Sequence, residues 1–141
     1  MMMQSDGLDL SPRKVEYLKY LRETGDCRKI GELAVHFSVD PSTVSKVVQE
    51  LASAGLITHR PYGRVMLTRE GTLHAEFLLR RHRILALILT HYGLKGEEAC
   101  QEASRFESYV SRGAVNKICR SLGHPTKGIC GSISHEPGCE L

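Results

Sequence analysis

Residues 40–51 of this chain read Asp-Pro-Ser-Thr-Val-Ser-Lys-Val-Val-Gln-Glu-Leu, and this stretch decides the fold. Asp40 is expected to cap a helix, and Pro41 fits its first position. Apolar side chains then recur at helical spacing, at Val44, Val47, Val48 and Leu51. Gly55 is a stop signal. The stretch therefore predicts an amphipathic helix over 41–54.

Two further helical patterns precede this one. The first begins after Ser11 with Pro12 at its first position and stops at Gly25, and the second covers about 29–37. The connection between 37 and 41 is short. Two helices joined so closely predict a helix-turn-helix unit, with the helix at 41–54 as its second member.

The spacing of apolar residues changes after Gly55. Residues 56–60 and 65–68 read as two short strands around a turn that contains Pro61 and Gly63. A β-hairpin attached to a helix-turn-helix is a winged helix. Three more helices are expected, from Thr68 or Thr72 to 92, over 97–110, and over 112–122 with Ser111 as N-cap. Residues 126–141 show no periodicity and are expected to be irregular.

The predicted fold is therefore mainly α. An N-terminal winged helix-turn-helix domain, made of three helices plus a β-hairpin wing, covers 1–74. An all-α domain follows over 75–125, and a tail over 126–141. With 141 residues, 41% of them hydrophobic, the chain is long enough for one compact domain or two small ones.

Composition also limits the function classes. No apolar run approaches the roughly 18–20 residues of a membrane span, and the N-terminus does not resemble a secretory signal, so a cytoplasmic protein without a membrane partner is expected. No nucleophile–base pair, phosphate-binding loop or carboxylate dyad supports catalysis, which predicts that the chain is not an enzyme.

The distribution of charge favours a nucleic-acid partner. The net charge is only +3, but residues 57–69 contain three arginines and no acid. The outward face of 41–54 offers small hydroxyls and one cation, which suit a helix in the major groove of double-stranded DNA. A protein-interaction module is the alternative, and the acid-free hairpin favours DNA. The predicted DNA contacts are Pro41, Ser42, Thr43, Ser45, Lys46, Arg60, Tyr62 and Arg64.

Several motifs, in the same order, resemble one known family. They are the stretch 40–51, then Gly55-Leu56-Ile57, Tyr62-Gly63, Leu67-Thr68, Glu70-Gly71, Arg81-His82-Arg83 and Leu122-Gly123-His124-Pro125-Thr126. Together they resemble the diphtheria toxin repressor and manganese transport regulator family of metal-dependent repressors. The resemblance implies a homodimer, with residues after about 75 forming the dimerisation domain. It also implies control of metal uptake genes by a divalent metal that favours DNA binding, and an inverted-repeat operator.

The resemblance implies metal ligands as well, and the chain keeps only part of them. Glu16, His82 and Glu107 stand at ligand positions, whereas Lys19 and two serines, Ser104 and Ser108, replace the others. A charged lysine has no lone pair to offer a metal.

Two interpretations follow for this site. In one, the site is relocated and uses Glu16, His82, Cys100 and Glu107, and the thiolate shifts its preference from Mn²⁺ toward Fe²⁺ or Zn²⁺. In the other, Lys19 takes the place of the cation by pairing with Glu107 or Glu16. The protein would then be a metal-independent or redox-responsive repressor with a degenerate metal site.

The C-terminal part holds a second group of potential ligands. Cys119, His124, Cys130, His135 and Cys139 lie within 21 residues. Such soft and borderline ligands suit a tetrahedral Zn²⁺ or an iron centre. The alternatives are a disordered tail with incidental thiols, or a metal-storage or enzyme module. The odd total of five cysteines favours reduced thiols or metal ligands over a disulfide framework.

Overall fold

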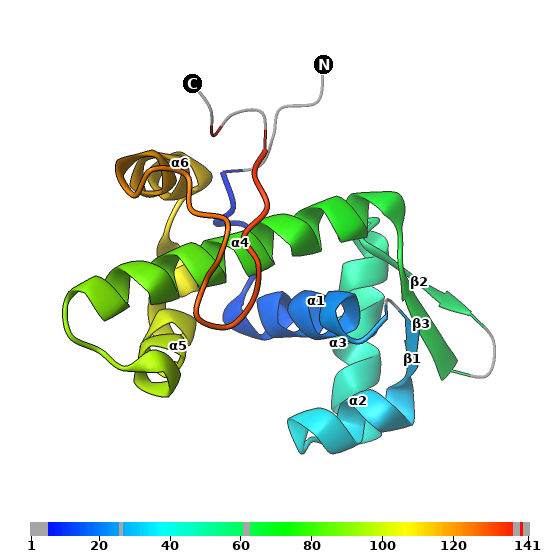
Figure 1. Ribbon diagram of the computed structural model, residues 1–141. Helices are drawn as coiled ribbons and strands as arrows, with labels where there is room; N and C mark the ends of the chain where they lie inside the picture. The colour runs from blue at the N-terminus through cyan, green and yellow to red at the C-terminus, as the bar shows by residue number, and fades with distance from the viewer. Residues whose placement is uncertain (1–5, 26, 61–62, 137–138, 140–141) are drawn as a thin grey trace. The chain divides into compact units, whose positions relative to one another are not determined.

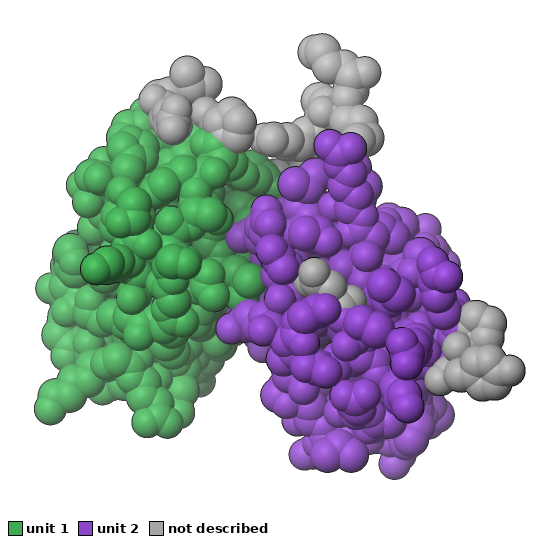
Figure 2. Space-filling view, turned by 45° about the vertical axis from the view of Figure 1, so that its right-hand side comes forward, with its two compact units in different colours: residues 1–12, 77–141 green, residues 13–76 purple. Residues whose placement is uncertain are grey.

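The computed structural model describes residues 6–25, 27–60, 63–136 and 139. The chain divides into two compact units, which Figure 2 shows in separate colours. We call residues 13–76 the N-terminal unit, and residues 1–12 with 77–141 the helical unit.

The N-terminal unit is a winged helix, as the sequence predicted (Figure 1). Its helices are α1 (Pro12–Glu23), α2 (Ile30–Phe37) and α3 (Pro41–Ser53). Its strands are β1 (Cys27–Lys29), β2 (Ile57–Arg60) and β3 (Arg64–Leu67), which form one antiparallel sheet in the order β1-β3-β2. The predicted apolar stripe of α3 is buried, with Val44, Val48 and Leu51 at most 1% exposed.

The wing differs from the prediction, because the sheet has three strands rather than two. Strand β1 pairs with β3 over Cys27–Met66, Arg28–Val65 and Lys29–Arg64. Three residues without alternating apolar side chains give no periodic signal, and the strand exists because β3 offers it a free edge.

Two helix boundaries also correct the prediction. The side chain of Asp40 makes no capping hydrogen bond at α3, and its backbone carbonyl instead accepts from the N–H groups of Thr43 and Val44 at 3.0 and 3.2 Å. The helix expected over 97–110 is α5 (Gly96–Phe106) followed by a 3₁₀ turn, η2 (Glu107–Tyr109). The side chain of Ser111 does cap the next helix, accepting from the Ala114 N–H.

The helical unit is built on α4 (Arg69–His91), whose first turns belong to the N-terminal unit. Helices α5 and α6 (Arg112–Ser121) follow it (Figure 1). Leu85, Ala86, Ala99 and Ala103 form a small core between α4 and α5, where alanines let the two helices approach closely. The tail was expected to be irregular, yet it contains a β-bridge between Lys127 and Ser132, and Ile133 is 4% exposed.

No helix in the described ranges is both long and apolar enough to cross a membrane.

The start of α4 depends on a close approach that only glycine allows. The Thr68 hydroxyl donates to the Gly55 carbonyl at 2.7 Å and accepts from the Gly71 N–H at 3.0 Å. A Cβ on Gly71 would lie 1.8 Å from the carbonyl oxygen of Leu56. Any other residue at 71 must therefore displace backbone.

Gly71→Ala is expected to lower the free energy of unfolding by about 1–3 kcal/mol, since this overlap cannot be relieved by a side-chain rotation. Gly113→Ala in α6 is the control, because nothing lies within 4 Å of its added Cβ. That control should be neutral or stabilising by up to about 1 kcal/mol. Urea unfolding followed by circular dichroism measures both, and equal midpoints would contradict the assigned close contact.

Candidate nucleic-acid interface and metal centres

The exposed face of α3 carries most of the predicted DNA-contacting side chains. Pro41, Ser42, Thr43 and Lys46 are exposed and Ser45 is half-buried. The apolar residues of α3 at 44, 47, 48 and 51 are buried, so this polar face is presented outward. Arg60 and Arg64 are exposed on the wing, and Tyr62 lies outside the described residues.

A row of three cations crosses the sheet and was only partly predicted. Lys29 pairs with Arg64 in the register of β1 and β3, and Arg64 pairs with Arg60 in the register of β3 and β2. Directly paired residues project from the same face, where like charges destabilise the sheet unless an anion lies between them. All three residues are exposed. We call them the cationic row, and Lys29 was missed because β1 was not predicted.

On α1, Glu16 is paired with Lys19. The Lys19 Nζ lies 3.1 Å from a Glu16 carboxylate oxygen, and Lys19 is only 6% exposed. This is one of the two pairings expected if lysine takes the place of a cation. Glu16 belongs to the N-terminal unit and the other predicted ligands to the helical unit, so its role as a ligand stays a prediction.

His82 of α4, which is half-buried, pairs with the buried Glu107 of η2. The His82 Nδ1 lies 2.6 Å from a Glu107 carboxylate oxygen, and Glu107 is 1% exposed. Because a carboxylate only accepts, Nδ1 carries the proton, and the opposite ring nitrogen, Nε2, is left to act as a ligand. Burial lowers the pKa of the neighbouring Arg81, and the charge of Glu107 opposes that shift.

His82 also lies against two cysteines. Ligand atoms of His82, Cys100 and Cys130 are all within 4.8 Å of one another. The predicted use of Cys100 with His82 is thus geometrically possible, whereas Glu107 contacts His82 as a hydrogen-bond partner. Ser104, expected to share the face of Cys100, is exposed. Cys130 had been grouped with the tail, and only the folded loop brings it here.

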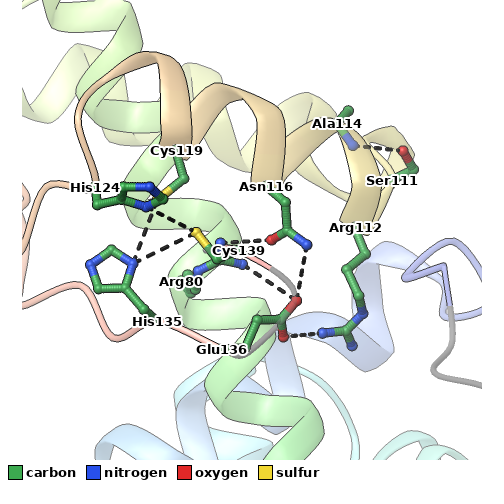
Figure 3. A network of polar contacts seen from close by, with 10 residues as sticks. All are labelled: Arg80, Ser111, Arg112, Ala114, Asn116, Cys119, His124, His135, Glu136 and Cys139. Carbon is green, nitrogen blue, oxygen red and sulfur yellow. Dashed lines mark hydrogen bonds and ion pairs between the residues drawn. The ribbon is translucent and has the colours of Figure 1, made fainter. Parts of the chain in front are cut away.

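The other four potential ligands of the C-terminal part come together at a separate place (Figure 3). Each of the two thiols, Cys119 and Cys139, contacts the Nδ1 atoms of His124 and His135 at 3.4–3.8 Å. Both cysteines are 0% exposed. Burial, together with the neighbouring Cys139 thiol, raises the pKa of Cys119 to about 11, and the guanidinium of Arg80 opposes that rise.

Comparison with known families agrees with this architecture. Residues 68–134 match the metal binding and dimerisation domain of the iron dependent repressors, and residues 8–63 match the MarR family model. The chain is similar to the DtxR/MntR family of iron-dependent repressors. Its members are transcriptional regulators rather than enzymes, as the sequence predicted.

The alignments with individual relatives cover different shares of this chain. Transcriptional regulator MntR of Escherichia coli O157:H7 is 35% identical over 91 residues, which are 64% of this chain but only 58% of that regulator. The regulator MntR of Listeria monocytogenes is 27% identical over 104 residues, 74% of this chain and 73% of its own length.

Solved structures of similar proteins share the fold. A manganese-dependent transcriptional repressor in complex with manganese has a TM-score of 0.72 and 30% identity, covering 88% of this chain and 63% of that one. A hypothetical protein from Sulfolobus solfataricus has a TM-score of 0.76 and 28% identity, covering 89% of this chain and all of that one. ScaR with bound Zn²⁺ has a TM-score of 0.72 and 29% identity, covering 82% of this chain and 56% of that one.

Glu107→Gln is expected to lower the free energy of unfolding by about 2–4 kcal/mol, since it removes the buried negative charge that faces His82 and Arg81. The matched control is Glu102→Gln on α5, whose ion pair with Arg105 is solvent-exposed. That control should stay within about 0.5 kcal/mol of the parent protein. Thermal and urea unfolding measure both variants, and equal losses would show that burial of the charge is unimportant.

Proposed function

We propose that the protein is a cytoplasmic homodimeric repressor that binds double-stranded DNA in response to a divalent metal and controls metal-ion uptake genes. The observation that carries the proposal is the exposed polar face of α3 together with the exposed cationic row of the same unit. The match of residues 68–134 to a metal binding and dimerisation domain supports the metal and the dimer.

The N-terminal unit supplies the DNA contacts. Helix α3 has 13 residues, and a helix of about 20 Å fits the major groove. Ser42, Thr43 and Ser45 allow a close approach and discriminate bases modestly, while Lys46 reaches a guanine or a phosphate. The cationic row contacts backbone phosphates, which supply the anions that its like charges need. A two-fold dimer then requires an inverted-repeat operator.

The metal response is assigned to His82, Cys100 and Cys130, which we call the sensing site. Three ligands leave coordination positions open, which suits an ion that exchanges with its surroundings. Two thiolates favour Fe²⁺ or Zn²⁺ over Mn²⁺. Glu107 holds the ring of His82 in the required tautomer. An ion joins side chains of α4, α5 and the tail, and it shifts the protein toward the DNA-binding arrangement only as far as it binds that arrangement better.

The Glu16–Lys19 ion pair favours a second candidate function. If the buried Lys19 ammonium replaces a cation on α1, DNA binding needs no metal. Redox chemistry at the thiols would then be the remaining input. The two candidates differ in one measurable property, the effect of a chelator on DNA affinity.

Fluorescence anisotropy with DNA from upstream of the protein's own gene separates them. Chelator-treated protein is expected to bind weakly, and anaerobic Fe²⁺ or Zn²⁺ should raise its affinity by about 5–150-fold, the usual range of such coupling. Cys100→Ser should lose that gain, whereas Cys27→Ser, whose thiol is in neither metal group, should keep it. Full affinity in chelator would contradict the metal response and support the second candidate.

Arg64→Gln, at the centre of the cationic row, is expected to weaken binding to all DNA sequences alike. In a plot of log affinity against log salt concentration, the magnitude of the slope should fall by about one, because one phosphate contact is lost. Arg105→Gln on α5 is the control, since it removes the same charge from outside the N-terminal unit. An unchanged slope for Arg64→Gln would place the wing away from the DNA backbone.

A further inference from the structure

Beyond the regulatory role, we propose that the chain holds a structural Zn²⁺ ion in a closed site made by Cys119, His124, His135 and Cys139. We call these four residues the clasp. Cys119 lies on α6, His124 follows that helix, and the other two ligands come from the tail. The site is distinct from the sensing site, with which it shares no residue.

The distances between the four ligand atoms match a tetrahedral zinc ion. Zn–S bonds of about 2.3 Å and Zn–N bonds of about 2.0–2.1 Å place a sulfur and a nitrogen of one tetrahedron about 3.6 Å apart. The four sulfur–nitrogen distances in the clasp are 3.4, 3.5, 3.8 and 3.8 Å. Both histidines present the same ring atom, Nδ1. Four independent distances of this size describe a ligand cage better than a chance meeting of side chains does.

The backbone before the clasp is bent so that His124 reaches it. His124 has a φ of 54°, a left-handed conformation that is uncommon for residues other than glycine. Its N–H donates to the Cys119 carbonyl at 2.9 Å, which closes the C-terminal turn of α6. Two ligands five residues apart are thereby brought to one side of the helix end.

A polar network formed by side chains of α4, α6 and the tail lies beside the clasp (Figure 3). Arg80 is 2% exposed and donates to the Asn116 side chain at 2.7 Å. Glu136, next to His135 in sequence, forms ion pairs with Arg80 and Arg112 and accepts from Asn116 at 3.3 Å. The network holds Glu136, and with it the tail beside the ligand His135, against α4 and α6.

The donor set selects zinc and a structural role. Two thiolates and two imidazoles in a tetrahedron suit Zn²⁺, whereas Mn²⁺ prefers oxygen ligands. Four protein ligands leave no position for water or a substrate. Two buried thiolates and one Zn²⁺ carry no net charge, so the ion removes the electrostatic cost of ionising both cysteines.

The clasp also explains how Cys130 reaches the sensing site. His124 and His135 stand at the two ends of residues 125–134, and their ring centroids are 5.7 Å apart. The loop between them is closed by the Lys127–Ser132 bridge, and Arg83 donates to the Ser132 carbonyl at 2.8 Å. Cys130 lies in this loop, against His82 and Cys100. The clasp therefore positions a sensing-site ligand, a step that rests on the proposed metal response.

Zinc content and zinc-edge X-ray absorption of the full-length protein test the clasp directly. After brief chelator treatment and gel filtration, the parent protein should retain one Zn²⁺ per chain, with two sulfur and two nitrogen neighbours at about 2.3 and 2.0–2.1 Å. Cys139→Ser should lose that ion. Cys130→Ser and Cys27→Ser should retain it with the same spectrum, since neither thiol belongs to the clasp.

A conservative exchange guards against misfolding of the cysteine variant. His135→Cys supplies a thiolate in place of an imidazole and should retain the zinc with three sulfur neighbours, whereas His135→Ala should lose it. Retention of zinc by both Cys139→Ser and His135→Ala, or a parent spectrum without two sulfurs, would overturn the clasp. These readouts need no DNA, so the clasp and the proposed repressor function fail separately.

Discussion

One basic turn of α4, residues 80–83, organises the whole helical unit. Successive side chains on a helix point about 100° apart, so four adjacent polar residues reach four different directions. Arg80 bonds to α6 and the tail, and Arg81 donates to the Gly7 and Val110 carbonyls. His82 pairs with Glu107 of η2, and Arg83 donates to the Ser132 carbonyl. The apolar cluster between α4 and α5 is small and alanine-rich. The long side chains of residues 80–83 therefore add to the stability of this unit both by hydrogen bonding and by packing.

The sequence predicts the helices and the wing well, because their apolar side chains follow regular periods. Strand β1 has no such period, and its three residues are extended only because β3 pairs with them. Because β1 was not predicted, one residue of the candidate DNA-binding surface was not predicted either. Lys29 completes the cationic row through the pairing register, a relation between residues 29 and 64 that no local pattern encodes. Local spacing therefore predicts the outward face of α3 but only part of the wing.

Metal ligands show the same limit more clearly. The three cysteines and two histidines of residues 119–139 were recognised by residue type and grouped as one cluster. Folding separates them, because closing the loop between His124 and His135 turns Cys130 away toward Cys100 and His82. Which ligands share an ion depends on that closure and on the anchoring of Glu136 by α4 and α6. Composition indicates metal chemistry here, and only the three-dimensional arrangement assigns it.

The two ligand groups differ in the way that structural and regulatory metals differ. The clasp offers four ligands, two of them fully buried, so an ion bound there has little reason to exchange. The sensing site offers three ligands, of which Cys130 lies on an exposed loop. Its histidine is oriented by a hydrogen bond to the buried carboxylate of Glu107. A tail this short and rich in glycine cannot hold Cys130 in place by packing alone. A tightly bound ion in the clasp, at the base of the loop, fixes the position of Cys130. A second, more weakly bound ion at the sensing site can then form and dissociate as the metal concentration changes.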